Sequence, residues 1–165
     1  MNIQITSHVP FGHLVVEPHI HLDAQITVDL RCDLDVNPRS DGYLMTVDAV
    51  GVRRRVEDRL GGLIAGKMLI WEEELGTDTG KAALPEGITQ LAFQDTVTPV
   101  RPTIEALTFL TAAVVCEQVE LLYPDGGVQV AGVRFAETSR TAGVLNGDEM
   151  ADAAALGLKL WKRFL

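Results

Sequence analysis

All four histidines of this 165-residue chain lie within its first 21 residues. Imidazole is a preferred ligand of zinc, and a catalytic zinc site needs three protein ligands and one open position. His19 and His21 are two residues apart, so on a strand both would point to the same face and could reach one ion. His8 could supply the third ligand from a neighbouring strand, and His13 is the remaining candidate. The same pair could also be an ordinary surface feature of an amphipathic strand.

The segment 20–36 should place these histidines, because apolar and polar residues alternate along it without a break. A period of two is typical of a strand with one buried and one solvated face. The pattern predicts a strand about 55 Å long whose solvated face begins at His19 and His21. The polar segment 37–42 predicts a turn, and 43–52 is expected to return as the second strand of a hairpin.

Further elements follow from apolar periodicity and from helix start and stop signals. Strands are expected at 1–6, 88–98 and 128–136, and helices at 55–75, from 102 to 122, and at 148–165. This order predicts an α+β fold, with an antiparallel sheet and helices on one face, in a single domain spanning 1–165.

Composition restricts the partners of the chain. The net charge of −9 argues against binding to nucleic acid, because phosphates require a basic surface. No apolar run is long enough to cross a membrane, and the N-terminus lacks the pattern of a signal peptide. Cys32 and Cys116 fall on predicted apolar faces, where they are expected to be buried core residues. A reducing, cytoplasmic location is therefore expected.

Four motifs in order resemble the 6-pyruvoyltetrahydropterin synthase and 6-carboxytetrahydropterin synthase family, which has the tunnelling fold (T-fold). An early histidine closes the first strand at His8, and a His-x-His pair opens the long strand at His19 and His21. A Pro-Thr-x-Glu helix start matches Thr103 and Glu105. A strand ending in Glu-Thr matches Glu137. The resemblance spans roughly residues 1–141, and the helix expected at 148–165 lies beyond the usual end of the family.

The resemblance implies a zinc-dependent lyase, in pterin or queuosine metabolism, that acts on 7,8-dihydroneopterin triphosphate or a related pterin. His8, His19 and His21 would hold Zn²⁺, with His13 as the substitute for His8. Glu137 would accept hydrogen bonds from the pterin ring, and Thr103 and Glu105 would frame the same pocket. The family also implies a homo-oligomer, expected here as a homohexamer, because its sheets join edge to edge.

The sequence departs from the family in its proton-transfer residues. The family places a cysteine before the His-x-His pair, but the segment 14–18 has none, and Glu17 is the candidate catalytic base instead. The Asp-His pair of the family is also absent, because no histidine follows His21; Asp78 and Asp95 are carboxylates in that region. A second hypothesis is therefore a T-fold paralogue that binds a pterin or purine-like ligand without the standard reaction.

Overall fold

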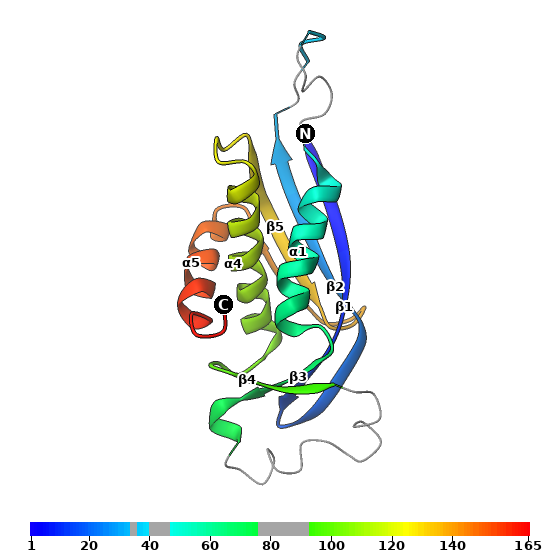
Figure 1. Cartoon of the computed structure of the whole chain (residues 1–165), viewed down its shortest axis with the longest axis vertical. Helices are drawn as coiled ribbons and strands as arrows, with labels where there is room; N and C mark the ends of the chain where they lie inside the picture. The colour runs from blue at the N-terminus through cyan, green and yellow to red at the C-terminus, as the bar shows by residue number, and fades with distance from the viewer. Residues whose placement is uncertain (34–35, 40–46, 76–92) are drawn as a thin grey trace.

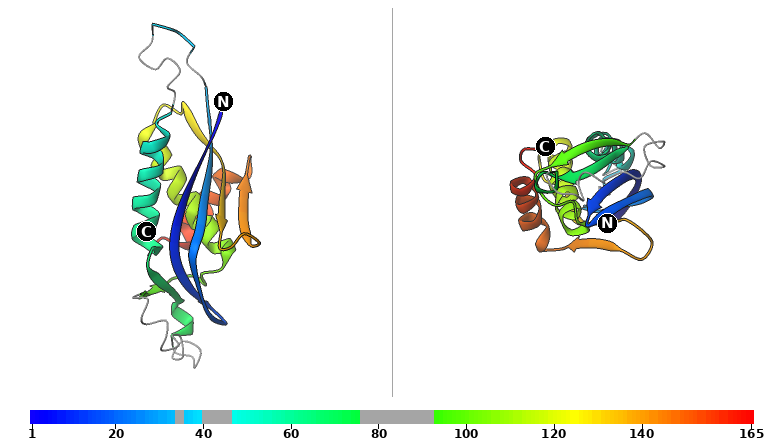
Figure 2. Two further views of the ribbon diagram at one scale, coloured as in Figure 1. Left: turned by 90° about the vertical axis from the view of Figure 1, so that its right-hand side faces the viewer. Right: turned by 90° about the horizontal axis from the view of Figure 1, so that it is seen from below.

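A computed structural model describes residues 1–33, 36–39, 47–75 and 93–165 of the chain. One six-stranded sheet has the order β4-β3-β1-β2-β5-β6, and helices α1, α4 and α5 lie together on one side of it (Figures 1 and 2). The strands are β1 (Asn2–Val15), β2 (Glu17–Cys32), β3 (Lys67–Trp71), β4 (Gln94–Thr98), β5 (Val128–Ala136) and β6 (Ala142–Asn146). The helices are α1 (Ala49–Ile64), the short 3₁₀ helix η1 (Glu72–Glu74), α4 (Ile104–Leu122) and α5 (Glu149–Leu160).

The predicted α+β class with helices on one face is confirmed. The sheet is mostly antiparallel, but β3 runs parallel to both β1 and β4. None of the described helices is long and apolar enough to cross a membrane.

The long hairpin has different strands from those predicted. β2 pairs with β1 along almost its whole length, and Val16 alone connects them, at a φ of 68°. The predicted return strand at 43–52 is wrong where it is described, because α1 begins at Ala49; residues 40–46 lie outside the described part. Asp48 starts this helix by accepting a hydrogen bond from the Gly51 amide, as a helix N-cap does.

A β-bulge interrupts the β1–β2 ladder near its centre. Val9 pairs with Ala24 and Phe11 pairs with His21, so Leu22 and Asp23 lie opposite the single residue Pro10. Proline has no N–H for the ladder, and a bulge is one of the few places where a strand tolerates it. The extra residue reverses the alternation of β2 on the two sides of the bulge.

This reversal corrects the predicted orientation of the histidines. C-terminal to the bulge, the even-numbered residues of β2 from Ala24 to Cys32 are buried, as the alternation predicts. N-terminal to it, the odd-numbered residues share that face, and Leu22 is 65% exposed. Directly paired residues of an antiparallel ladder point the same way. His21 therefore lies beside the buried Phe11, on the helix-covered face rather than the solvated one.

The core fills the space between this sheet face and the helices. Val56 and Leu60 of α1 and Leu107 and Leu110 of α4 are all buried against the sheet. The predicted helix from 102 is confirmed as α4, and its N-cap is Thr103, whose side chain accepts from the Ala106 amide. The predicted strand 128–136 is confirmed as β5.

Other elements differ in extent from the prediction. The helix expected at 55–75 runs from Ala49 to Ile64, and the chain then turns at Gly66, whose φ of 66° favours glycine. The apolar residues that follow form β3, because they pair with β1 and β4. β4 covers the end of the strand expected at 88–98, whose residues 88–92 lie outside the described part. β6 was not predicted, and α5 is shorter than the expected 148–165.

Close packing joins α5 to α4. A Cβ atom placed on Gly157 of α5 would collide with the backbone carbonyl of Phe109 in α4. Trp161 is completely buried, and its indole N–H donates to the Ala106 carbonyl at 2.9 Å. The C-terminal helix is thus fixed to the segment that begins α4.

We expect Gly157→Ala to destabilise the protein by about 1–3 kcal/mol, because the added methyl forces α5 away from α4. The matched control is Gly62→Ala in α1, where a Cβ would meet nothing within 4 Å. That change should stabilise by about 0.5–1 kcal/mol through the helix preference of alanine. Urea denaturation measures both, and equal effects of the two substitutions would contradict the close α4–α5 contact.

Candidate metal centre

Four chemically active side chains meet where β1, β2 and β5 lie side by side. His13 pairs directly with His19 across the hairpin, and His21 lies two residues further along β2. Glu137 follows the last residue of β5, where its amide donates to the Thr141 carbonyl at 3.1 Å and begins the turn to β6. Antiparallel pairing thus brings residues from three segments to one point on the helix-covered face.

The imidazoles of His13 and His21 face each other through their Nε2 atoms, which are 3.1 Å apart. The Glu137 carboxylate lies beside both: Oε1 is 3.3 Å from His13 Nε2, and Oε2 is 4.0 Å from His21 Nε2. One ligand atom from each of these residues lies within 4.8 Å of the other two. The side chains are only 7%, 12% and 11% exposed for His13, His21 and Glu137.

The backbone determines the tautomer of His13. Its Nδ1 lies 2.8 Å from the carbonyl oxygen of Pro102, which can only accept a hydrogen bond. Nδ1 must therefore carry the proton, which leaves a lone pair on Nε2 in the neutral ring. A histidine ligand with its other ring N–H held by a carbonyl is the usual arrangement in metal sites.

Burial shifts the ionisation of all three groups toward their neutral forms. Desolvation lowers the pKa of His13 and of His21, and it raises the pKa of Glu137. The charges of the histidines oppose the rise at Glu137, whereas the nearby charge of Glu105 adds to it. Neutral imidazoles retain the lone pairs that metal coordination requires.

The geometry of this cluster fits a divalent cation. Two nitrogen ligands of a tetrahedral zinc ion are about 3.3 Å apart, close to the observed Nε2 separation. Glu137 Oε1 is buried and accepts no hydrogen bond within the described residues. A cation between the three side chains would satisfy this oxygen and both nitrogen lone pairs.

Of the predicted ligands, His8 is not brought to this cluster. It occupies an even-numbered position of β1, so it points to the opposite sheet face from Phe11 and His13. There it is exposed, and its Nδ1 lies 2.6 Å from Asp23. His13, the substitute considered for this place, takes the inward position. The sequence carried a signal for this choice, because His13 continues the buried odd-numbered series of Ile5 and Val9.

His19 lies at the rim of the cluster. Its ring centroid is 5.5 Å from that of His13 and 6.4 Å from that of His21, and its side chain is 45% exposed. Its Nε2 is 3.7 Å from Glu17, which follows the hairpin turn at Val16. Glu17 itself is largely exposed, so this pair faces the solvent beside the buried centre.

The predicted pocket residues on α4 lie at its N-terminus. The side-chain oxygen of Thr103 caps the helix by accepting a hydrogen bond from the Ala106 amide, whereas Glu105 is exposed in the first turn. Pro102, the residue before the cap, supplies the carbonyl that holds His13. Asp95 is exposed on β4, and Asp78 lies outside the described residues.

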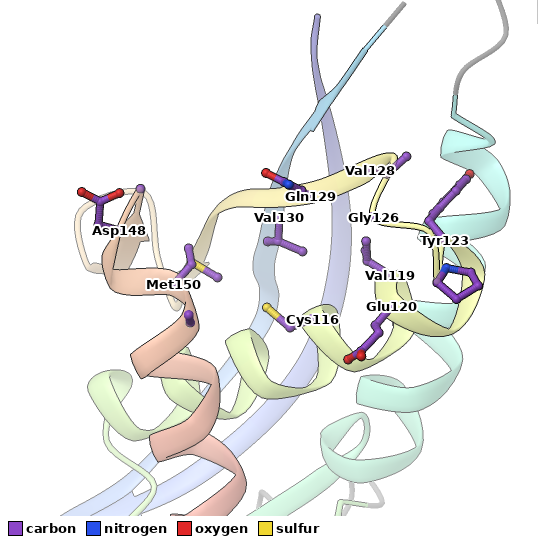
Figure 3. A pocket seen from close by; sticks show the side chains of 13 residues that line it. Cys116, Val119, Glu120, Tyr123, Gly126, Val128, Gln129, Val130, Asp148 and Met150 are labelled. Atoms are coloured by element: carbon purple, nitrogen blue, oxygen red, sulfur yellow. The ribbon is translucent and has the colours of Figure 1, made fainter.

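A separate groove of about 590 Å³ lies at the other end of α4. Figure 3 shows side chains from α4, β5 and the start of α5 around it, among them Cys116, Glu120 and Met150. Burial raises the pKa of the Cys116 thiol to about 11, so this sulfur is a poor nucleophile at neutral pH. Its lining residues from α4 belong to the C-terminal half of that helix, so the groove is separate from the candidate metal centre beside Pro102.

Solved structures share this architecture. A 6-pyruvoyltetrahydropterin synthase from Plasmodium vivax superposes with a TM-score of 0.62 at 12% identity, over 89% of this chain and 97% of that one. The fold is that of a 6-pyruvoyltetrahydropterin synthase. The Caenorhabditis elegans 6-pyruvoyl tetrahydropterin synthase gives a TM-score of 0.53 at 13% identity, over 90% and 96% of the two chains.

An uncharacterized protein from Wolinella succinogenes, WS1659, is also similar in structure, with a TM-score of 0.53 at 18% identity, over 90% of this chain and 99% of that one. No family model matches the sequence, and no curated protein matches it. The resemblance inferred from the four motifs is thus supported by the fold, at an identity typical of a divergent member.

Proposed function

We propose that this protein is a zinc-dependent lyase that acts on 7,8-dihydroneopterin triphosphate or a related pterin. The observation that carries the proposal is the buried cluster of His13, His21 and Glu137 within a 6-pyruvoyltetrahydropterin synthase fold. The cluster combines two neutral imidazoles with a carboxylate, a donor set that zinc accepts.

His13, His21 and Glu137 are the proposed zinc ligands, and His19 lies at the rim with its ring centroid 5.5 Å from that of His13. When bound, zinc would act as a Lewis acid that makes the side-chain hydroxyls of the substrate more acidic. His13 is held for this purpose by the Pro102 carbonyl. In this arrangement Glu137 binds the metal. The exposed Glu105, expected to frame the pterin pocket, is then the carboxylate proposed to accept from the ring N–H groups of the substrate.

Glu17 is the proposed catalytic base. Glu17 directly follows the turn residue Val16, and its side chain is exposed beside the cluster. Its Oε1 lies 3.7 Å from Nε2 of His19. A one-residue turn leaves no room for a loop with a cysteine between Val15 and Glu17. The P. vivax enzyme was solved with a glutamate, described as a catalytic residue, replaced by alanine. This precedent supports a glutamate in the corresponding role here.

The second candidate function is a paralogue that binds a pterin or purine-like ligand without the standard reaction. It is favoured by the absence of any histidine after His21, which removes the Asp-His pair of the family. Zinc binding is common to both candidates, and only turnover separates them.

We further propose a homohexamer formed through the sheet edges. β4 and β6 are the outer strands, and each exposes an apolar side chain, Val97 and Val144. Such edges have unpaired backbone groups that can pair with another chain. A neighbouring subunit would also cover the exposed Glu17 and His19 and complete the pocket.

A cytoplasmic location completes the proposal. Cys32 and Cys116 are both free thiols in the structure. Unpaired cysteines are usual in a reducing compartment.

Zinc binding tests the metal centre. Protein purified without a histidine tag should contain about one zinc per chain by mass spectrometry. His21→Ala should weaken zinc binding more than about 100-fold in a chelator competition, because it removes a ligand rather than an outer partner. His8→Ala, on the opposite face, is the matched control and should bind zinc like the wild type.

Glu137→Gln separates the two roles of that carboxylate. Loss of zinc supports a ligand, whereas retained zinc with a raised KM supports a contact to the pterin ring. A wild-type protein that binds no zinc would overturn the proposed function.

Turnover of 7,8-dihydroneopterin triphosphate tests the base. Glu17→Gln should lower kcat by about 10²- to 10⁴-fold and leave zinc content unchanged, because the amide cannot accept the proton. Glu73→Gln, another exposed glutamate, is the control for lost charge. An unchanged rate in Glu17→Gln would exclude this base. A zinc-loaded wild type without turnover would favour the binding paralogue.

Light scattering tests the assembly. The expected mass is that of six chains, and Val97→Lys with Val144→Lys should reduce it, because charges on edge strands oppose pairing. The mass of a single chain for the wild type would contradict the hexamer.

A further inference from the structure

An ion pair between the buried Glu74 and the partly exposed Arg101 lies next in the chain to a backbone contact of the candidate metal centre. Glu74 ends η1, and Arg101 lies 27 residues later, in the segment between β4 and α4. The next residue, Pro102, has the carbonyl that binds Nδ1 of His13. The ion pair is therefore one residue away from the group that determines the tautomer of a proposed ligand.

Arg101 is held at several points. Its Nε and Nη2 atoms both donate to Oε1 of Glu74, at 3.1 and 2.7 Å. The Glu74 side chain is almost completely buried, whereas that of Arg101 is partly exposed. The guanidinium also lies over the Trp71 ring, 5.4 Å from its centroid, at the end of β3. These contacts connect Arg101 to β3. This strand is the neighbour of β1, and β1 carries His13.

The backbone around Pro102 is fixed on both sides. The Thr103 amide donates to the Arg101 carbonyl at 2.8 Å, which closes a three-residue turn with Pro102 at its centre. The φ fixed by the proline ring suits the inverse form of this turn. Thr103 caps α4, and the buried Thr98 hydroxyl donates to the Val100 carbonyl at 2.7 Å. These contacts hold the Pro102 carbonyl so that its oxygen points toward Nδ1 of His13.

We propose that Glu74 and Arg101 are positioning residues that aim the Pro102 carbonyl at His13 and so hold its Nε2 lone pair toward the metal. The part that concerns metal affinity rests on the proposed function, whereas the part that concerns the His13 tautomer does not. Neither residue touches the cluster itself. Their action passes through the backbone of 101–102.

A purely stabilising role explains the Glu74–Arg101 pair less well than the positioning role does. Burying the Glu74 carboxylate is costly, and an ion pair with a partly exposed arginine contributes little net stability. The pair nevertheless adjoins Pro102, whose carbonyl oxygen lies 2.8 Å from Nδ1 of His13. A second ion pair from η1, Glu72–Arg163, has the same 2.7 Å separation but is more exposed and has no link to His13 in the described structure.

The test compares two matched double variants. Glu74→Gln with Arg101→Met removes both charges of the Glu74–Arg101 pair. Glu72→Gln with Arg163→Met removes the exposed pair and changes the same residue types. Nitrogen NMR of the histidine rings in metal-free protein reports the tautomer of His13. Competition with a chelator measures the affinity for Zn²⁺, and thermal denaturation of the metal-free proteins shows that both variants fold.

The wild type and the Glu72/Arg163 variant should show His13 as a single Nδ1–H tautomer and bind Zn²⁺ equally. In the Glu74/Arg101 variant a mixture of tautomers should appear, and zinc affinity should fall about tenfold, the lower end for outer partners of a metal ligand. Arg101→Lys, which keeps the charge but loses the planar fork, should lie in between.

The proposal fails if the tautomer and the zinc affinity of the Glu74/Arg101 variant match those of the control variant. If the wild type binds no zinc, the proposed function fails, and the tautomer comparison still decides the positioning role. If the Glu74/Arg101 variant does not fold, Arg101→Lys alone decides it, and a wild-type tautomer and affinity in that variant would overturn the proposal.

Discussion

One extra residue in β2 determines which face of the sheet receives the histidines. Opposite Pro10 the strand contains two residues, Leu22 and Asp23, and the alternation of side chains reverses at that point. Without this bulge, His19 and His21 would share the solvated face with Asp23. With it, they face Phe11 and His13 under the helices. The burial of the cluster, its neutral imidazoles and its distance from His8 all follow from this shift in register.

Placing three titratable groups in this region is costly unless they have a partner. His21 stacks on Phe11 at 5.2 Å between ring centroids, and Phe11 contacts Phe135 edge to face at 5.4 Å. Burial in these surroundings favours uncharged rings, which is why the pKa of His13 and that of His21 fall. Glu137 Oε1 accepts no hydrogen bond from the part of the chain that the structure describes, although most buried polar atoms have a partner. Packing thus holds the side chains of the site in place, and Glu137 Oε1 keeps a free capacity to accept a hydrogen bond or bind a cation among the described residues.

The sequence predicts those features that depend on neighbouring residues. The helix start near 102–103 and the apolar face of α4 are local, as is the alternation in β5, and both predicted elements agree with the structure. The strand partner of β2 is a long-range choice, and alternation alone does not distinguish β1 from 43–52. β3 has only five residues and follows a helical pattern, so its pairing with β1 and β4 outweighs local preference. The choice between His8 and His13 depended on the parity of β1, which the sequence contains, and on the bulge, which only Pro10 signals.

The one-residue turn at Val16 places the proposed catalytic base, Glu17, apart from the proposed metal ligands. Two proposed ligands, His13 and His21, lie within the β1–β2 ladder, and the third, Glu137, follows β5. Glu17 lies at the hairpin tip, where the strands reverse direction. A hairpin tip accepts inserted residues without altering the pairing of the strands behind it. Loop length at this point can therefore change, and with it the proposed catalytic base, while the proposed metal ligands keep their positions. Residues added at this hairpin tip would leave the strand pairing that places His13 and His21 unchanged.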